Sequence, residues 1–304
     1  MDTSIVLTLY GRQAKAAAEA MEEEILSLEN QLSTEISNSE IAQLNRNNGG
    51  TLSDRVNELW ECASYINRIT AGAFDLTLYP LSVEWGFIGG DYQVPDKGTI
   101  QQLLIHIGMD KRQYDREAKT LSFEEGTKLD FGGIAKGYAS MRLLAVLSEY
   151  DVDSALINLG GNVQVYGKKP DASTYKVAIR DPLDSENYLG ILSACDVAVV
   201  TSGGYERCFT SNGKTYHHLL DPATGYPAEN GVSSVTVVCQ NGTYADGLST
   251  ALFILGPEKS KELWQSGIYD FDFCMLTTSG ELYVTEGLLD RLESSRPIIP
   301  LTNQ

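Results

Sequence analysis

Hydrophobic residues recur at two different spacings along the chain, and the spacing changes near its middle. In the first half, apolar positions three and four residues apart predict amphipathic helices over about 13–31 and 53–66, with Ser53 as the expected N-cap of the second. Beyond residue 150, short apolar runs predict strands at 154–159, 163–166, 175–179, 190–192, 197–200 and 233–238, then a hairpin over 269–284. One helix, over about 244–255, interrupts these strands.

The order of these segments indicates an α+β protein with mixed or antiparallel sheets flanked by helices. The chain contains no internal repeat, low-complexity tract or long Pro/Ser linker, so we expect residues 1–304 to form one domain. An Asn-rich loop is expected over 45–50, and an aromatic-rich loop over 73–87. Gly160 and Gly161, between two strands, predict a tight turn.

The segment 128–138, with the sequence KLDFGGIAKGY, is the most informative part of the chain. It predicts a short strand that ends at Asp130, a turn through Gly132 and Gly133, and a helix that carries Ile134 and Tyr138 on its apolar face. The first turn of a helix offers unpaired N–H groups and a positive dipole end, so a phosphate ester with its metal ion would be accommodated there. A plain strand-to-helix connection explains the glycines equally well.

Charge and cysteine content limit the possible partners. The 23 basic and 41 acidic residues give a formal net charge of −18, which repels phosphate backbones and makes nucleic acid a poor candidate. The five cysteines show no C-x-x-C spacing, and we expect them to be small buried hydrophobes. No apolar run is long enough to span a membrane, and no signal peptide is evident, so the protein is either cytoplasmic or lacks an export segment that was removed.

Two further segments carry residues suited to chemistry. Asp246 and Thr250 lie four residues apart on the predicted helix, which places a carboxylate and a hydroxyl on one face, and all-oxygen ligation of this kind suits magnesium. Helix capping by Asp246 and packing of Thr250 is the alternative. His217 and His218 precede a turn signal, Asp221-Pro222-x-x-Gly225, and a histidine there is well placed for proton transfer.

The loop over 201–207, TSGGYER, either contacts a ligand through backbone N–H groups or is a simple turn, and its residues alone do not decide between them.

Several segments, in the same order, resemble the ApbE family of FAD:protein FMN transferases. The matching segments are the opening Met-Asp-Thr, NSEIAQLN, AFDLTLYPL with WGF, LDFGGIAKGYA, LINLGGN, VTSGGYER, HHLLDPATGYP and ADGLSTAL. They span nearly the whole chain. The resemblance implies an ApbE-like, T-fold-related unit that uses Mg²⁺ to transfer FMN from FAD to a threonine or serine of a partner flavoprotein, of the redox-pump or FMN-binding-domain type, with release of AMP.

The resemblance also implies roles for individual residues. The metal would be held by the backbone carbonyl of Gly133 and by Asp246 and Thr250, with help from Ser249. His218 corresponds to the histidine that activates the acceptor hydroxyl. The implied FAD contacts are Met1, Ala73, Phe74, Asp75, Asp130, Lys136 and the backbone at Leu220.

The resemblance leaves two points open. Near Glu35 some relatives carry a tyrosine that touches the flavin, so another aromatic residue must serve here. The lipoprotein signal common in the family is absent from this sequence, so an extracytoplasmic, membrane-anchored location is an expectation by resemblance only.

Two other functions fit the same residues: an FAD pyrophosphatase that releases FMN and AMP, and a protein that binds and delivers FAD without chemistry.

Overall fold

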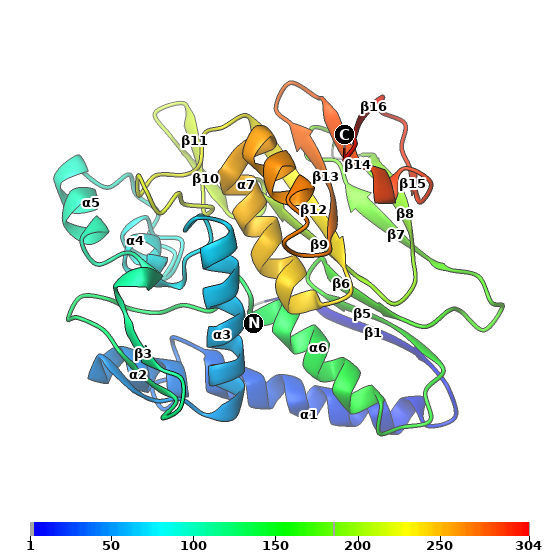
Figure 1. Ribbon diagram of the computed structural model, residues 1–304, viewed down its shortest axis with the longest axis horizontal. Coiled ribbons are helices and arrows are strands. Elements are labelled where there is room, and N and C mark those ends of the chain that lie inside the picture. Colours follow the sequence, from blue (N-terminus) through cyan, green and yellow to red (C-terminus); the bar gives the residue numbers. More distant parts are fainter. Residues whose placement is uncertain (1–2, 185, 304) are drawn as a thin grey trace.

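A central sheet of eight strands organises the molecule, and the computed structural model describes residues 3–184 and 186–303 (Figure 1). Its strand order is β1-β5-β6-β9-β12-β13-β14-β16. Neighbouring strands are antiparallel except β14 and β16, which are parallel. The strands of this sheet are β1 (Ile5–Tyr10), β5 (Ser154–Leu159), β6 (Asn162–Tyr166), β9 (Ala198–Gly203), β12 (Val232–Cys239), β13 (Asp272–Thr277), β14 (Leu282–Thr285) and β16 (Ile298–Leu301).

Helices cover one face of this sheet, where α6 and α7 cross in front of the central strands (Figure 1). The larger hydrophobic core fills the space between them and includes Met21, Ile66, Phe131, Val237 and Phe273. The helices are α1 (Ala14–Leu32), α2 (Glu40–Asn47), α3 (Asp54–Ile69), α4 (Tyr79–Glu84), α5 (Lys97–Leu104), α6 (Ala135–Leu147) and α7 (Gly242–Gln265), with 3₁₀ turns η1 (Leu76–Leu78), η2 (Met109–Lys111) and η3 (Glu286–Leu288). No helix in the described ranges has the length and apolar character needed to cross a bilayer.

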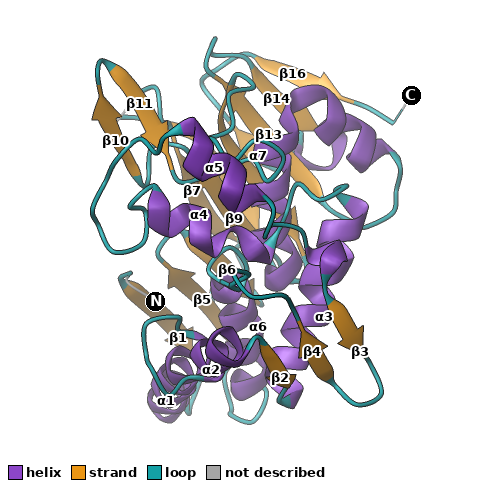
Figure 2. Ribbon diagram, turned by 90° about the vertical axis from the view of Figure 1, so that its left-hand side faces the viewer, coloured by secondary structure: helices purple, strands orange, loops and turns teal. Residues whose placement is uncertain are grey.

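Three small sheets complete the structure. One of them, β15-β8-β7, covers the opposite face of the central sheet and encloses a second core that includes Val165, Tyr175 and Leu192. The β10–β11 hairpin lies beside α4 and α5 at one end of the molecule (Figure 2). The strands of these sheets are β2 (Gly49–Thr51), β3 (Gln113–Asp115), β4 (Thr120–Ser122), β7 (Tyr175–Arg180), β8 (Tyr188–Ala194), β10 (Cys208–Ser211), β11 (Lys214–His217) and β15 (Leu292–Glu293).

The α+β class with mixed and antiparallel sheets is confirmed. Helices α1 and α3 fall where the apolar spacing predicts them, and the Ser53 hydroxyl accepts the Val56 N–H as an N-cap. The two-residue turn between β5 and β6 is also confirmed, because Gly160 and Gly161 both adopt positive φ, 62° and 91°, as a type I′ hairpin turn requires.

Some local predictions were wrong. Residues 127–130 form no strand, because Asn45 of α2 takes over the backbone pairing: its side chain accepts from Leu129 N–H at 2.7 Å and donates to Leu129 C=O at 2.8 Å. The expected loop at 45–50 is shorter than predicted, because residues 45–47 form the last turn of α2 and β2 begins at Gly49. The predicted helix over 244–255 extends to Gln265, through a kink at Gly256 (φ 78°) followed by Pro257.

The cysteine prediction holds for two residues only. Cys239 and Cys274 are buried, whereas Cys62 and Cys195 are partly exposed and Cys208 is exposed. All five are free thiols.

Candidate functional site

The site begins where the N-terminal turns of α6 and α7 touch. A Cβ atom added to Gly137 would lie 2.1 Å from the Gly242 carbonyl oxygen, and one added to Gly242 would lie 2.3 Å from Ser140 Oγ. Since real Cβ atoms do not approach other atoms this closely, the two helices meet only because both positions are glycine. This contact brings the glycine turn of the segment 128–138 to the predicted metal-binding helix.

Asp246 projects from α7 to the beginning of α6. Its Oδ2 accepts the Gly137 N–H at 2.8 Å, and the side chain is buried. Burial raises the pKa of Asp246 above its usual range, while the positive charge of Lys136 and the Gly137 N–H oppose that rise. The carboxylate thus caps α6 from outside, although the capping alternative placed it on its own helix.

Hydroxyl groups gather on the same side of α7. Ser202 Oγ on β9 lies 2.8 Å from Ser249 Oγ and 3.3 Å from Thr250 Oγ1. Ser249 in turn donates to the Asp246 carbonyl at 2.8 Å. Asp246, Ser249 and Thr250 therefore do come together, and they offer oxygen atoms only, the donor type that Mg²⁺ prefers.

Unpaired polar atoms adjoin this oxygen cluster. Asn162, the first residue after the Gly160-Gly161 turn, is buried, and neither Oδ1 nor Nδ2 has a hydrogen-bond partner in the described part of the chain. The Asn162 side chain lies close to Asp246 and acts to lower its pKa, although the contact does not reach hydrogen-bond geometry. Buried groups left without partners are uncommon and indicate a ligand or ordered water at the site.

The donor set fits a magnesium ion that shares its coordination sphere with a ligand. No group of three or more His, Cys, Asp or Glu side chains suited to a metal exists within 3–184 and 186–303, so a metal here would rely on few carboxylates, with Asp246 as the one in this donor set. Magnesium is commonly bound by one or two carboxylates together with phosphate oxygens of a substrate. No N–H of the described residues donates to the Gly133 carbonyl, because the Gly137 N–H turns to Asp246 instead. That carbonyl is therefore available, as the resemblance implies.

The glycine turn itself is held from two sides. Asp130 Oδ1 accepts the Gly132 N–H at 2.8 Å, and burial raises the pKa of Asp130, opposed by this N–H and by the charge of Arg207. Phe74 packs against Gly133, where a Cβ would lie 3.3 Å from the ring. Gly132 and Gly133 themselves are exposed, so a ligand can approach their backbone closely.

The two adjacent histidines point in different directions. His217 lies edge-on against Phe253, and its Nε2 contacts the Ala228 carbonyl at 3.2 Å. His218 is partly exposed, and its Nδ1 lies 3.3 Å from the Arg207 carbonyl. Dense packing around the ring lowers the pKa of His218 to about 4, and the neighbouring positive charges of Arg207 and Lys136 act in the same direction. His218 is therefore a neutral imidazole at pH 7 in a partly exposed position.

An aromatic cluster supports His218. The Phe87 ring lies 6.4 Å from it, and Trp85 donates from Nε1 to the Gly225 carbonyl at 2.9 Å. Asp221 closes the predicted turn by accepting the Gly225 N–H at 2.8 Å on its carbonyl, and Leu220 is buried and pairs with Pro227. The segments 73–87 and 216–227 thus form one structural unit, not two separate loops.

The structure also places the remaining residues implied as FAD contacts. Ala73 and Phe74 are buried next to the glycine turn, and Lys136 lies in the first turn of α6. Asp75 caps η1, since its Oδ1 accepts the Thr77 N–H at 2.7 Å and its Oδ2 accepts the Met109 N–H at 3.0 Å. Met1 lies outside the described residues. Glu35 is exposed.

Sequence reasoning missed three residues around the site. Ser202 and Glu206 lie in the segment 201–207, whose residues alone do not decide between a ligand contact and a turn, and Asn162 appears only as the last residue of the matching segment LINLGGN. Burial raises the pKa of Glu206, with the charges of Lys136 and Arg207 opposing the rise, although the side chain retains solvent contact. The polar side chains in the segments 156–162 and 201–207 could have drawn attention to these residues. The sequence does not show that they lie near α7, because α7 is distant from both segments along the chain.

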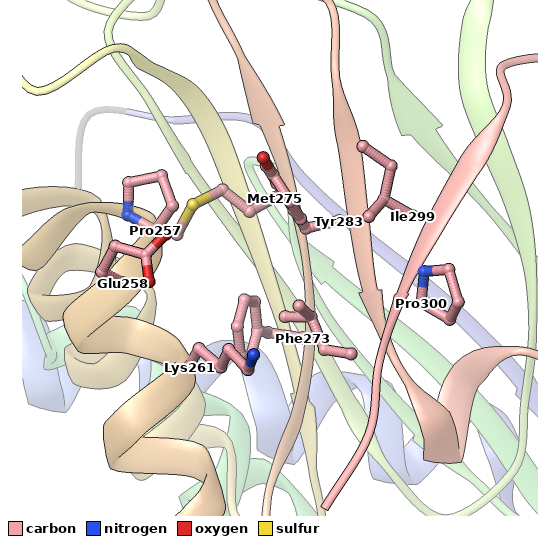
Figure 3. Close-up of a pocket in the computed structure, with 9 residues that line it drawn as sticks. Pro257, Glu258, Lys261, Phe273, Met275, Tyr283, Ile299 and Pro300 are labelled. Carbon is pink, nitrogen blue, oxygen red and sulfur yellow. The ribbon is translucent and has the colours of Figure 1, made fainter. Parts of the chain in front are cut away.

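A groove elsewhere on the molecule is distinct from this site. It lies between the part of α7 beyond its kink and strands β13, β14 and β16, and is lined by Pro257, Lys261, Phe273, Met275 and Tyr283 among others (Figure 3). Its volume of about 200 Å³ is below the roughly 300–1,000 Å³ typical of small-molecule sites. Asp246 lies on the other side of the kink, so this groove is not the candidate site.

Fold and site together define an α+β protein with a cluster of oxygen donors beside a glycine turn and a neutral histidine nearby. A family model described as "ApbE family" matches residues 1–273, and the chain belongs to this family. Among solved structures, the ApbE protein of Thermotoga maritima superposes with a TM-score of 0.86 at 30% identity, covering 94% of each chain. The flavinyl transferase ApbE of Pseudomonas stutzeri, in its apo form, gives 0.80 at 30% identity, covering 92% of this chain and 93% of that one.

Curated relatives carry a more specific name. A protein of Klebsiella pneumoniae (strain 342) is 35% identical over 266 residues, which cover 85% of this chain and 81% of the relative. One from Treponema pallidum (strain Nichols) is 32% identical over 308 aligned positions, covering 93% and 84%. Both are named FAD:protein FMN transferase.

Proposed function

We propose that this protein is a magnesium-dependent FAD:protein FMN transferase, which moves FMN from FAD to a threonine or serine hydroxyl of a partner flavoprotein. The observation that carries the proposal is the contact of Asp246 with the first turn of α6, next to the hydroxyl groups of Ser249 and Thr250. A carrier that only stores FAD has no need of a buried carboxylate beside an exposed glycine turn. The names of the relatives supply the reaction class.

The proposed reaction exchanges one phosphoester partner for another. The acceptor oxygen forms a bond to the FMN phosphorus, the bond from that phosphorus to the AMP oxygen breaks, and AMP leaves. The hydroxyl proton is taken up at a ring nitrogen of His218, which is neutral at pH 7 and accessible to solvent. A bound Mg²⁺ would supply Lewis-acid stabilisation of the charge that develops on the phosphoryl oxygens.

The chain's own residues would orient the pyrophosphate. The exposed backbone of Gly132 and Gly133 allows close approach, and Lys136 brings a positive charge to a protein whose net charge is −18. Phe74, packed on Gly133, fixes the turn. Among the aromatic residues near His218, Phe87 and Tyr92 are candidates to contact the flavin ring in place of the tyrosine that relatives carry near Glu35.

Mass spectrometry tests the proposal directly. A threonine-containing flavoprotein domain, of the redox-pump or FMN-binding-domain type, is incubated with this protein, FAD and Mg²⁺, with EDTA as the matched control. Covalent FMN on the acceptor and AMP in solution are expected only with Mg²⁺. Free FMN and AMP without modified acceptor would show an FAD pyrophosphatase instead, and unchanged FAD would show a binding and delivery protein.

We also propose an extracytoplasmic, membrane-anchored location for the full-length protein, on the strength of the lipoprotein signal common in the family. Fractionation of cells that express the native gene tests this proposal, and recovery of the protein only in the cytoplasmic fraction would contradict it.

A further inference from the structure

Ser202 connects the central sheet to the proposed metal-binding face of α7. It lies on β9, opposite Val235 of β12, and its hydroxyl contacts two hydroxyls of α7, Ser249 at 2.8 Å and Thr250 at 3.3 Å. The family resemblance assigns Ser202 no role. Its contacts suggest a role, because the available partners determine where the hydroxyl protons of Ser202, Ser249 and Thr250 point.

The assignment starts from Ser249. Its hydroxyl donates to the Asp246 carbonyl at 2.8 Å, and a carbonyl can only accept, so the single Ser249 proton is used there. The Ser202 hydroxyl must then donate to Ser249 Oγ across their 2.8 Å contact. With both of those protons used, the contact between Ser202 and Thr250 requires Thr250 to donate.

This order of donors leaves Thr250 Oγ1 with its proton directed at Ser202 and its lone pairs unused. The described part of the chain offers the Thr250 hydroxyl no hydrogen-bond partner other than Ser202. A hydroxyl binds a cation through its lone pairs, so its proton must point elsewhere.

We propose that Ser202 is a positioning residue that fixes the proton of Thr250 away from the cation site, so that Thr250 presents lone pairs to a divalent ion. The inference rests on the proposed function, since it assumes that Asp246 and Thr250 hold a metal. Without Ser202, the Thr250 proton has no fixed acceptor, so its lone pairs are no longer held toward the cation site and the hydroxyl becomes a weaker ligand. The loss should therefore appear in metal affinity, with the fold intact.

Binding of Mn²⁺ to the full-length, FAD-loaded protein, followed by electron paramagnetic resonance, tests the proposal without an activity readout. We expect Ser202→Ala to weaken Mn²⁺ binding about three- to tenfold, the effect of one modest hydrogen bond. Ser202→Thr keeps the hydroxyl and should restore affinity to within about twofold of wild type. Ser202→Cys, whose thiol is a weak donor and acceptor, should fall between them and carries the test if the alanine variant does not fold.

Thr201→Val is the matched control. Thr201 also pairs with a hydroxyl at 2.8 Å, that of Thr236 on the neighbouring strand, but as the adjacent residue on β9 it faces the other side of the sheet. Its loss should leave Mn²⁺ affinity unchanged. Equal weakening by Thr201→Val and Ser202→Ala, or full affinity in Ser202→Ala, would overturn the proposal.

A second control separates this inference from the proposed function. Asp246→Asn should abolish site-specific Mn²⁺ binding if the metal site is correctly placed. If wild type and Asp246→Asn bind Mn²⁺ alike, the metal assignment itself is wrong. If Asp246→Asn loses the ion while Ser202→Ala does not, only the positioning role is refuted.

Discussion

Substitution of Asp246 separates the structural task of this side chain from its proposed task as a metal ligand. Its Oδ2 accepts the Gly137 N–H at 2.8 Å in a buried position, where the first turns of α6 and α7 touch. Asp246→Ala leaves that N–H without a partner, which costs about 1–3 kcal/mol in the free energy of unfolding. Asp246→Asn keeps an acceptor oxygen and removes a charge that burial disfavours, so we expect a cost below about 1 kcal/mol.

These energies correspond to measurable shifts in melting temperature. A loss of 1 kcal/mol changes the midpoint by about 2–4 °C in a protein of roughly 150–250 residues, and a chain of 304 residues falls at the lower end of that range, about 2 °C. The alanine variant should therefore melt roughly 2–6 °C below wild type and the asparagine variant within about 2 °C of it. Differential scanning calorimetry in EDTA gives both values without metal effects. Both variants should nevertheless lose Mg²⁺-dependent flavinylation by about 10²–10³-fold, because a cation that contributes several kcal/mol to transition-state stabilisation loses its only carboxylate ligand.

The asparagine variant tests whether Asp246 is a metal ligand. A folded Asp246→Asn protein that still flavinylates its acceptor within tenfold of the wild-type rate, and still requires Mg²⁺, would refute the assignment of Asp246 as a ligand. If both variants melt like wild type, the capping of α6 by this carboxylate is wrong. Binding of FAD, measured by fluorescence quenching, should persist in the asparagine variant and shows that the site remains assembled.

Three further predictions follow from the same geometry. His218→Gly should lower the rate of flavinylation by about 10²–10⁴-fold while FAD still binds. The His217 ring lies against Phe253, so His217→Ala should lower stability more than rate. The opposite pattern in single-turnover assays would show that the base is misassigned. The pKa of His218 is lowered to about 4 in the folded protein, so between pH 6.5 and 4 the unfolded chain binds more protons and the free energy of unfolding falls as the pH falls. His218→Gln should flatten the plot of unfolding free energy against pH in this window. The same slope in wild type and variant would contradict the low pKa. Gly137→Ala should destabilise the protein by about 1–3 kcal/mol or more and abolish Mn²⁺ binding, because its methyl group would lie 2.1 Å from the Gly242 carbonyl oxygen. Ala145→Ser, on the exposed side of α6, is the control and should change neither stability nor Mn²⁺ binding.

Much of this protein could be read from local patterns in the sequence. Helices α1 and α3 follow from apolar residues three and four positions apart, because that spacing places them on one helical face. The turn at Gly160-Gly161 follows from the positive φ that two-residue hairpins require. Asp246 and Thr250 could be paired in advance because the geometry of one helix fixes their relation, and the ApbE family could be named because its motifs appear in order.

Other features depended on contacts between segments that are distant in the sequence. The apolar pattern predicts a strand at 128–130, but Asn45, more than eighty positions earlier, supplies the backbone's hydrogen bonds and no strand forms. Nothing near Asp246 in the sequence shows that its carboxylate caps α6, and nothing near Ser202 shows that its hydroxyl reaches α7. Sequence spacing determines which side chains share a face of one element, whereas the packing of one element against another determines which groups are desolvated and which hydrogen-bond partners remain. The residue types of the site were therefore set by the sequence, and their charge states and proton positions by the tertiary structure.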